Sequence, residues 1–479
     1  MCAVSTVSGP ITPTAGYTEG AGASARFSSP RGVVVDGAGY ELYVADSVNN
    51  RVRAVVIASG ATRVLSGSGV AASTDGTGAG AAHSSPFALA LSSAGQLYVT
   101  DRGSGRIRRV AAATGAVATI AGTGTQSRVD GVGTASATFS APSGLALDEA
   151  GGLLYVSDCV ASSTLGAVLR RLNLATGQVT TLAGQGAATA AYLDGVGTNA
   201  KFQVNMYSPL LVGALLYLTD SASNRLRVMN TSSLLVSTVA GSGASADASG
   251  VGLAASFKGV DGLVANASGW LFAIELNGGT LRRVNNRTLA VDTLAFTGAV
   301  GNADGACATA TINSPQFLAL DRRTGNVFIT DTANHNIRAV VTVPASSTAS
   351  PTPSASPSPP PCFAPPGSFC NGSVVTPCPP GTFAQAGGTH TACAVCLEGH
   401  FCPSGTASAA RMNCGVGHFC AAGAAAPRRC PTQLAPPPFA AWEQHPLRVQ
   451  GPAFLVETAA CLNHCFWNFS SGDGALSRC

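Results

Sequence analysis

An acid and an arginine stand seven residues apart in the segment LYVADSVNNRVRAV, where Asp46 ends one apolar run and Arg53 lies in the next. A carboxylate and a guanidinium at this spacing could take part in catalysis, bind a ligand, or form an internal ion pair. The segment recurs six times along the chain, at intervals of about 55–62 residues. Any role given to the pair must therefore account for all six copies.

The six copies keep both charges. The acids are Asp46, Asp101, Asp158, Asp220, Glu275 and Asp331. The arginines are Arg53, Arg108, Arg170, Arg227, Arg282 and Arg338. The interval is seven residues in five copies and twelve in the third, which carries an insertion in its loop.

Two interpretations of the repeated pair stay open. If the loop is a four-residue hairpin turn, the arginine is the diagonal same-face neighbour of its acid. An arginine on a covered face needs such a partner, because an unpaired buried charge costs several kcal/mol. We favour this structural role for the acids, since six equal copies argue against an asymmetric catalytic site, and we assign no catalytic residue. The alternative is a ring of six arginines that binds an anionic ligand.

The period of the repeat predicts the fold. Each copy contains a turn-rich connector, a short apolar run, the LYVxD run, the arginine-bearing run and a Thr/Val run such as VSTVAGSG. Four strands joined by Gly, Asn, Asp and Ser turns make a four-stranded antiparallel blade. Six blades closed into a ring remove most exposed sheet edges. We predict an all-β, six-bladed β-propeller over residues 1–343.

Both ends of the propeller segment are expected to close the ring together. The sixth copy ends after NIRAVVTV without a Thr/Val run, and residues 3–9, AVSTVSG, match the missing run. This N-terminal strand would then complete blade six. Cys2 lies on it and Cys307 opens the sixth copy, so a disulfide between the two could hold the ring closed.

The runs ADSVNNRVRAV, TDSASNRLRVM and TDTANHNIRAV, the STVAGSG strands and the connector DGVGTASATFSAPSGLALD resemble the repeats of the NHL-repeat family. The resemblance covers about residues 3–343 and implies a six-bladed propeller. It implies no single function, because that family includes protein binders, RNA binders, sensors and relatives of propeller enzymes.

Few propeller residues suit a metal. Its two histidines, His83 and His335, belong to different blades, which excludes a three-His zinc site. We expect both histidines at the surface or in loops. No metal site and no cofactor is predicted, while a calcium site of Asp, Asn and backbone oxygens stays an open alternative.

The chain changes character after the propeller. Residues 344–361 are a Ser/Pro-rich linker that cannot bury a core. Over residues 362–431, CPPGTF, CLEGHFC and CGVGHFC begin 18 residues apart and resemble the cysteine-rich modules of ephrin-receptor-like ectodomains. Residues 432–479 form an unassigned cysteine-containing tail. Disulfides should hold this region together, and the candidates are Cys362, Cys370, Cys378, Cys393, Cys396, Cys402, Cys414, Cys420, Cys430, Cys461, Cys465 and Cys479.

Cysteine use indicates an oxidising compartment. Twelve of the 15 cysteines follow residue 361, a density typical of secreted disulfide-rich segments. Candidate glycosylation sites fit secretion, and they are Asn230, Asn266, Asn286, Asn371 and Asn468. Neither a signal peptide nor a membrane-spanning run is visible. We therefore expect an extracellular or cell-surface protein of which this chain is a section, with a leader or an anchor outside it.

The composition narrows the function. A net charge of +4 gives no reason to expect nucleic acid as a partner. The leading interpretation is a non-catalytic recognition or scaffold protein that binds a protein or glycan partner on one propeller face. The loops that break the repeat, 159–167 and 186–207, are the better contact sites. Two alternatives stay open, a propeller hydrolase or lyase with a channel calcium and a structural wall or matrix component.

Overall fold

The computed structural model describes residues 2–160, 166–184 and 192–342, and short segments between residues 368 and 429. The chain divides into two units, Met1–Thr348 and Ala349–Cys479, which are described separately. Within the described part of the chain, no helix has the length and apolar character needed to cross a bilayer.

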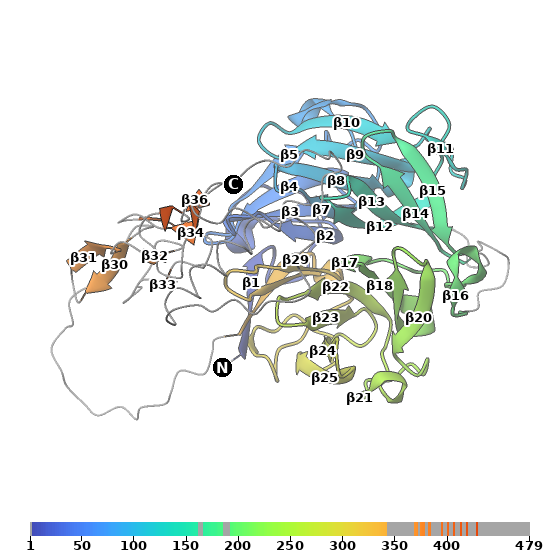
Figure 1. Ribbon diagram of the computed structural model, residues 1–479. Helices are drawn as coiled ribbons and strands as arrows, with labels where there is room; N and C mark the ends of the chain where they lie inside the picture. Colours follow the sequence, from blue (N-terminus) through green and yellow to red (C-terminus); the bar gives the residue numbers. More distant parts are fainter. Residues whose placement is uncertain are drawn as a thin grey trace, which may run out of the picture. The chain divides into compact units, whose positions relative to one another are not determined.

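The first unit is a six-bladed β-propeller of antiparallel sheets, as the repeat predicts (Figure 1). Each blade is built from four consecutive strands, and the sixth takes its last strand from the start of the chain. From the innermost strand outward, the blades are β2 (Pro30–Val35), β3 (Glu41–Asp46), β4 (Arg51–Val56) and β5 (Thr62–Ser66); β7 (Pro86–Leu91), β8 (Gln96–Asp101), β9 (Arg106–Ala111) and β10 (Ala116–Ala121); β12 (Ala141–Asp148), β13 (Leu153–Cys159), β14 (Val168–Asn173) and β15 (Gln178–Ala183); β17 (Leu210–Val212), β18 (Leu215–Asp220), β19 (Arg225–Asn230) and β20 (Leu235–Ala240); β22 (Val260–Ala265), β23 (Trp270–Glu275), β24 (Leu281–Asn285) and β25 (Ala290–Ala295); and β27 (Pro315–Leu320), β28 (Val327–Asp331), β29 (Asn336–Thr342) and β1 (Cys2–Ser8).

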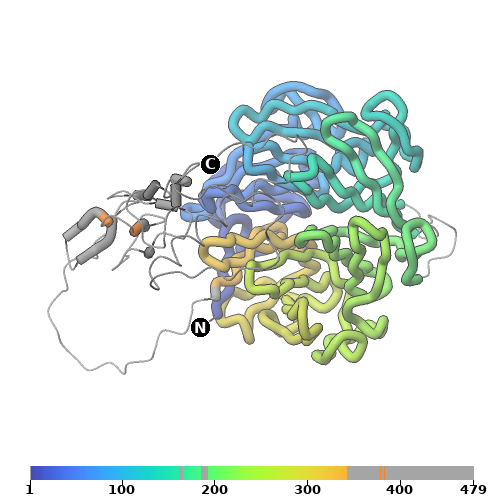
Figure 2. The backbone as a smooth tube through the Cα atoms, in the orientation of Figure 1, coloured from blue at the N-terminus to red at the C-terminus, as the bar shows by residue number. Residues whose placement is uncertain are grey.

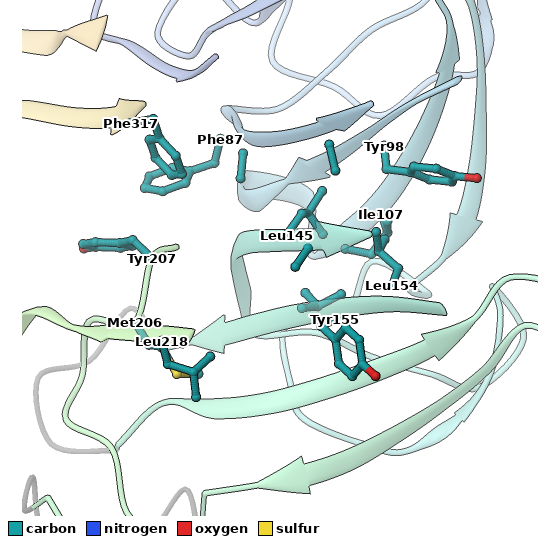
Figure 3. Packing of buried hydrophobic residues seen from close by; sticks show 14 of the residues in the cluster. Phe87, Tyr98, Ile107, Leu145, Leu154, Tyr155, Met206, Tyr207, Leu218 and Phe317 are labelled. Carbon is teal, nitrogen blue, oxygen red and sulfur yellow. The ribbon is translucent and has the colours of Figure 1, made fainter. Parts of the chain in front are cut away.

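The innermost strands form a closed ring. Each of β2, β7, β12, β17, β22 and β27 contacts the next, and β27 contacts β2 again. Both faces of most blades are covered by neighbouring blades, so runs such as LYVAD are buried along almost their whole length. Figure 3 shows buried side chains of neighbouring blades packed together, among them Ile107 of β9, Leu145 of β12 and Leu154 of β13.

The ring closes as predicted. Strand β1 pairs antiparallel with β29, with Val4 opposite Val340, and the N-terminal segment lies beside the last blade (Figure 2). Cys2 and Cys307 form a disulfide whose Cα atoms are 5.4 Å apart, across 305 residues of sequence. Hydrogen bonds and one covalent bond thus join the two ends of the propeller.

The blades differ from the prediction in one respect. Five of them carry a short fifth strand from the connector on their outer edge, namely β6 (Gly76–Thr77), β11 (Gly131–Val132), β16 (Gly195–Val196), β21 (Gly250–Val251) and β26 (Gly305–Ala306). In the first blade a single bridge between Gly20 and Thr62 takes its place. The connector passes this edge before it reaches the innermost strand, and it satisfies backbone groups that would otherwise be unpaired.

Short 3-10 helices fall into two sets. One set lies in the connectors, and it comprises η1 (Gly22–Ser24), η2 (Gly78–Gly80), η4 (Gly197–Asn199) and η6 (Gly252–Ala254). The other set follows the hairpin acid directly, and it comprises η3 (Arg102–Ser104), η5 (Ser221–Ser223) and η7 (Thr332–Asn334). Because connectors and hairpin loops lie at the same ends of the strands, both sets belong to one face of the propeller.

The second unit is described only in short strands. They pair as β30 (Ser368–Asn371) with β31 (Val374–Pro377); β32 (Thr382–Ala384) with β33 (Ala394–Val395) and β35 (Thr406–Ala407); β34 (His400–Phe401) with β36 (Met412–Asn413); and β37 (His418–Phe419) with β38 (Arg428–Arg429). Cys378 is disulfide-bonded. The linker, the tail and all predicted disulfide cysteines other than Cys370 and Cys378 lie outside the described residues. The likeness to ephrin-receptor modules therefore stays a prediction.

Candidate functional site

The acid and arginine of each hairpin form a buried ion pair. The distance from the arginine Nη1 to the carboxylate oxygen is between 3.0 and 3.2 Å in all six blades, and all twelve side chains are 0% exposed. In the first blade Asp46 lies opposite Arg51, two residues before Arg53, so the arginine is the diagonal neighbour that the hairpin predicts. The predicted pairing is confirmed.

Each acid also binds the connector that enters its blade. A backbone N–H of the connector, shortly before the innermost strand, donates to the carboxylate. In blade one this donor is Ser28 N, 2.8 Å from Asp46 Oδ1. The donors of the other blades are Ser84, Ser140, Gln203, Lys258 and Asn313. Burial nevertheless raises the pKa of Asp158 and of Asp331 to about 6, because it outweighs the nearby arginines and hydrogen bonds. The acid thus fixes the start of the innermost strand.

A second acid in the connector completes the arginine's hydrogen bonds in four blades. The Nη2 atom of the arginine lies 2.7 or 2.8 Å from Asp75, Asp130, Asp194 or Asp304, and these carboxylates are about half exposed. Sequence reasoning missed this partner. The signal was present as the Asp-Gly dipeptide that recurs in the connectors.

An apolar ring covers the arginine in most blades. The rings of Phe27, Phe139, Phe202 and Phe257 have centroids 5.2 to 5.6 Å from the guanidinium carbon of their blade. In blade two His83 takes this position in the connector loop, and it is 0% exposed, so it is the loop histidine of the expectation but not a surface one. Burial and the charge of Arg108 lower the pKa of His83 to about 3, which keeps the ring neutral.

His335 lies in a loop, as expected. It ends η7 in the left-handed conformation, and its Nδ1 accepts a hydrogen bond of 3.1 Å from Ser29 N. Among the residues that the structure describes, no three His, Cys, Asp or Glu side chains gather into a metal-binding group.

A direct ligand role for the six arginines stays a prediction. Their side chains are fully buried and already donate to carboxylates and connector carbonyls. This arrangement favours the structural interpretation of the pair.

A different set of residues meets on the propeller axis. In each blade the hairpin acid pairs across the sheet with a residue at or near the start of the innermost strand, such as Pro30 opposite Asp46. The residue that follows this position is of a different type in every blade. The six are Arg31, Phe87, Ser143, Tyr207, Asp261 and Gln316. A β-bulge begins at this point in blades one, two, three, five and six. Bulges redirect side chains, and they are frequent beside functional sites. We call these six residues, with Arg102 of η3, the axial cluster.

Contacts between non-neighbouring blades place the cluster on the axis. The Phe87 ring of blade two lies 5.5 Å from the Tyr207 ring of blade four and 5.6 Å from the Phe317 ring of blade six (Figure 3). Arg31 Nη1 of blade one also donates to Gln316 Oε1 of the adjoining blade six. Side chains from blades that do not adjoin can meet only where the innermost strands converge.

Two guanidinium groups share one aromatic ring in this cluster. The Cζ atoms of Arg31 and Arg102 lie 4.6 and 4.7 Å from the centroid of Phe87. Burial, followed by the charge of Arg102, lowers the pKa of Arg31. The two cations are therefore close enough to repel each other, and an anion between them would relieve the repulsion.

A buried acid lies near Arg31. Asp261 is 0% exposed, and neither carboxylate oxygen makes a well-formed hydrogen bond among the described residues, although the Ser221 side chain is near enough to lower its pKa. Burial raises the pKa of Asp261 to about 7, although Ser221 and Arg31 lower it in part. Burial also raises the pKa of Tyr207 to about 12, so its hydroxyl stays protonated.

The blades alternate in how they bring this cluster together. In blades one, three and five the residue after the axial-cluster residue is a glycine, namely Gly32, Gly144 or Gly262. A Cβ on these glycines would lie only 2.0 to 2.7 Å from the carbonyl oxygen of Phe87, Tyr207 or Gln316, respectively, in the next blade. In the even blades Ala88, Ser208 and Phe317 occupy this position instead, and their N–H groups donate to Thr100, Thr219 and Thr330. Small residues thus let each odd-numbered blade approach the next one closely.

The two irregular loops that the sequence suggests as contact sites, 159–167 and 186–207, meet beside the axial cluster. Cys159 Sγ lies 3.5 Å from both the N and the O of Met206, directly before Tyr207. The Cys159 thiol is buried, and burial raises its pKa. Residues 161–165 and 185–191 of these loops lie outside the described part of the chain. The described ends of the two loops therefore adjoin the axial cluster, while their role as contact sites stays a prediction.

The propeller sequons lie at the other ends of the strands. Asn230 ends β19, Asn266 follows β22 and Asn286 follows β24, so all three belong to turns on the face away from the hairpin acids. Asn371 is in β30, and Asn468 lies outside the described residues. Their glycosylation stays a prediction.

Comparison with known proteins agrees with the repeat. No protein-family model matches the chain. It is 33% identical over 140 residues to Protein SUPPRESSOR OF QUENCHING 1, chloroplastic, of Arabidopsis thaliana, a match that covers 28% of this chain and 13% of that protein. It is also 33% identical over 144 residues to NHL repeat-containing protein 2 of Bos taurus, covering 28% of this chain and 20% of the relative. The chain therefore spans a minor part of the curated relatives it matches.

Solved structures show the same fold at low identity. A protein of unknown function from Bacteroides thetaiotaomicron superposes with a TM-score of 0.55 at 20% identity. An auxiliary nutrient binding protein from Bacteroides ovatus superposes with a TM-score of 0.53 at 15% identity. Both matches cover 71% of this chain and 76% of the other. The chain is thus a six-bladed propeller with similarity to NHL repeat-containing proteins.

Proposed function

We propose that this protein is a non-catalytic recognition protein that binds a protein or glycan partner on the propeller face at which the axial cluster opens. The observation that carries the proposal is the asymmetry of that cluster. The surrounding scaffold repeats six times, while the axial residues are a different type in each blade. A rigid scaffold that presents non-repeated residues is a common basis of binding.

Two further observations support this face. The three propeller sequons belong to turns at the opposite face, so glycans there would leave the axial face free. The same fold serves nutrient-binding proteins among the structural neighbours and is therefore compatible with ligand binding.

We further propose an extracellular or cell-surface location. The Cys2–Cys307 disulfide and the disulfide-bonded Cys378 fit an oxidising compartment. The relatives' activities and partners are not carried over, because the matches span a small share of those proteins.

A screen of the full chain against arrayed glycans and purified extracellular proteins tests the proposal. Arg102→Glu changes the axial face, and Arg322→Glu makes the same charge change in the exposed β27–β28 turn of the opposite face. We expect a selected partner to lose binding to the first variant and to keep binding to the second. Binding that survives the first variant, or the absence of any partner, would count against the proposal.

The same purified protein separates the other candidates. Turnover of lactone or ester substrates would favour the hydrolase or lyase alternative. Self-association without a bound ligand would favour a structural matrix component.

A further inference from the structure

The two arginines of the axial cluster have donors to spare. The side chain of Arg31 makes one hydrogen bond, from Nη1 to Gln316 Oε1, and no acceptor lies in range of the Arg102 guanidinium among the described residues. A guanidinium carries five N–H donors, which match a carboxylate in a two-point geometry. Both side chains are partly exposed, so their free N–H groups are accessible to a ligand.

The arginines are held in place without an acidic ion-pair partner. Phe87 supports both guanidinium groups and is itself packed against Tyr207 and Phe317. Neither arginine forms a salt bridge in the described structure, in contrast to the six hairpin arginines. A preorganised cationic pair without an anion between its members is complementary to an anionic ligand.

Hydroxyl-binding groups adjoin the cationic pair. The Tyr207 hydroxyl has no hydrogen-bond partner among the described residues, and the Gln316 amide nitrogen also makes no bond there, since only its Oε1 is engaged by Arg31. By contrast, the backbone N–H groups of Ala88, Ser208 and Phe317 are already bonded to threonine hydroxyls. The cluster therefore suits a ligand rich in hydroxyl groups better than a peptide backbone.

We propose that the axial cluster binds the carboxylate group of a sugar acid, with Arg31 and Arg102 on the carboxylate and with Tyr207 and Gln316 on the sugar hydroxyls. This inference rests on the proposed recognition function and names the ligand class for that face. Asp261, buried near Arg31, limits the net positive charge of the site when it is ionised. A monoanion matches that charge better than a dianion such as phosphate.

Calorimetric titration of the full chain with D-galacturonate and D-galactose tests the inference. The two sugars share a ring and differ in the carboxylate, so their comparison isolates the arginine contacts. We expect D-galacturonate to bind at least about tenfold tighter than D-galactose. Arg102→Gln and Arg31→Gln should each weaken D-galacturonate about 10- to 100-fold, which is the effect of losing a charged hydrogen-bonded contact.

The control is Arg322→Gln, which removes the same charge from an exposed turn on the opposite face and should leave the affinity within about twofold. Arg31→Lys keeps the charge without the planar pair of donors, and it should weaken binding if geometry matters. Thermal melting of each variant shows whether it is folded. A folded Arg102→Gln variant with unchanged affinity would overturn the inference.

Further outcomes distinguish a failure of the sugar-acid assignment from a failure of the proposed recognition function. Tighter binding of the acidic peptide Gly-Glu-Gly than of D-galacturonate, lost with Arg102→Gln, would overturn the sugar acid as the ligand class. A partner from the screen that loses binding to Arg102→Glu but keeps its affinity for Arg31→Gln and Arg102→Gln would overturn the carboxylate assignment and leave the recognition function standing. Failure of every ligand and partner to bind would remove both.

Discussion

Replacement of Asp101 by asparagine should destabilise the propeller far more than replacement of Asp75, although both acids bind Arg108. Asp101 is 0% exposed, and its Oδ2 accepts from Arg108 Nη1 at 3.0 Å while its Oδ1 accepts from Ser84 N at 2.5 Å. Asp75 is 52% exposed and lies 2.8 Å from Arg108 Nη2. The two substitutions therefore remove the same charge from one arginine in two environments.

The expected magnitudes follow from burial. In Asp101→Asn the new amide N–H₂ must face a donor, either Ser84 N–H or the Arg108 guanidinium, and no rotamer satisfies both. Breaking a buried pair costs about 3–5 kcal/mol, and we expect about 3 kcal/mol because Asp75 still binds Arg108. Asp75→Asn should cost about 1 kcal/mol or less, since water replaces part of the interaction.

Urea unfolding of the two variants and the parent chain at pH 7, followed by tryptophan fluorescence and circular dichroism, gives the comparison. The first unfolding transition is the relevant one, because a chain of this size need not unfold in a single step. An Asp101→Asn variant within about 1 kcal/mol of the parent, or an Asp75→Asn variant equally destabilised, would refute the structural role of the hairpin pair.

Three other substitutions probe the same scaffold. Glu275→Gln should be tolerated, because burial and the neighbouring Asp247 carboxylate raise the pKa of Glu275 and glutamine imitates its protonated form. As the pH falls, Glu275 binds its proton at a higher pH in the native state than in the unfolded state, so the stability of the parent falls as pH rises above about 4.5. Urea unfolding at pH 5 and pH 8 should therefore show a smaller loss of stability in the variant than in the parent. His83→Phe should protect the propeller at low pH, because a pKa of about 3 against 6.5 for the free side chain costs the parent ~3 kcal/mol at pH 4. At pH 7 urea unfolding should find the variant about 1 kcal/mol less stable, because Ser66 Oγ, 2.9 Å from His83 Nε2, loses its buried hydrogen bond. An unchanged acid midpoint would contradict this. Cys2→Ser should lower the free energy of unfolding of the propeller by about 2–5 kcal/mol, and reduction of the parent should lower it by the same amount. Reduction of the variant should leave the propeller transition unchanged, because Cys378, which is also disulfide-bonded, belongs to the second unit.

The repeated parts of the propeller could be predicted from the sequence because they are repeated. The LYVxD runs, the seven-residue interval and the orphan strand at residues 3–9 fix the blade, the ion pair and the closure. The third blade shows why this worked, since Arg170 still reaches Asp158 despite the insertion. The contact between the acid and the arginine depends on how the two hairpin strands pair, and not on the length of the loop between them.

The candidate site could not be predicted in the same way. Arg31 and Asp261 occupy equivalent positions in different blades. Comparison of the six copies shows that the residue at this position varies, but it does not show that these side chains meet. Their proximity depends on bulges and on the close approach at Gly32 and Gly262, which period and composition do not reveal. His83 was misjudged for a related reason, because alignment with the phenylalanines of other copies, and not its own polarity, indicates its burial.

The central claim is that the repeated hairpin pairs support the fold while the axial cluster binds the partner. Hydrogen-exchange mass spectrometry of the full chain, with and without oligogalacturonate, tests it most directly. The account predicts slower exchange in peptides that contain residues 28–32 and 102–104, with no change in the opposite-face turns at 36–40 and 322–325. Protection confined to those turns, or no protection in any peptide, would contradict it.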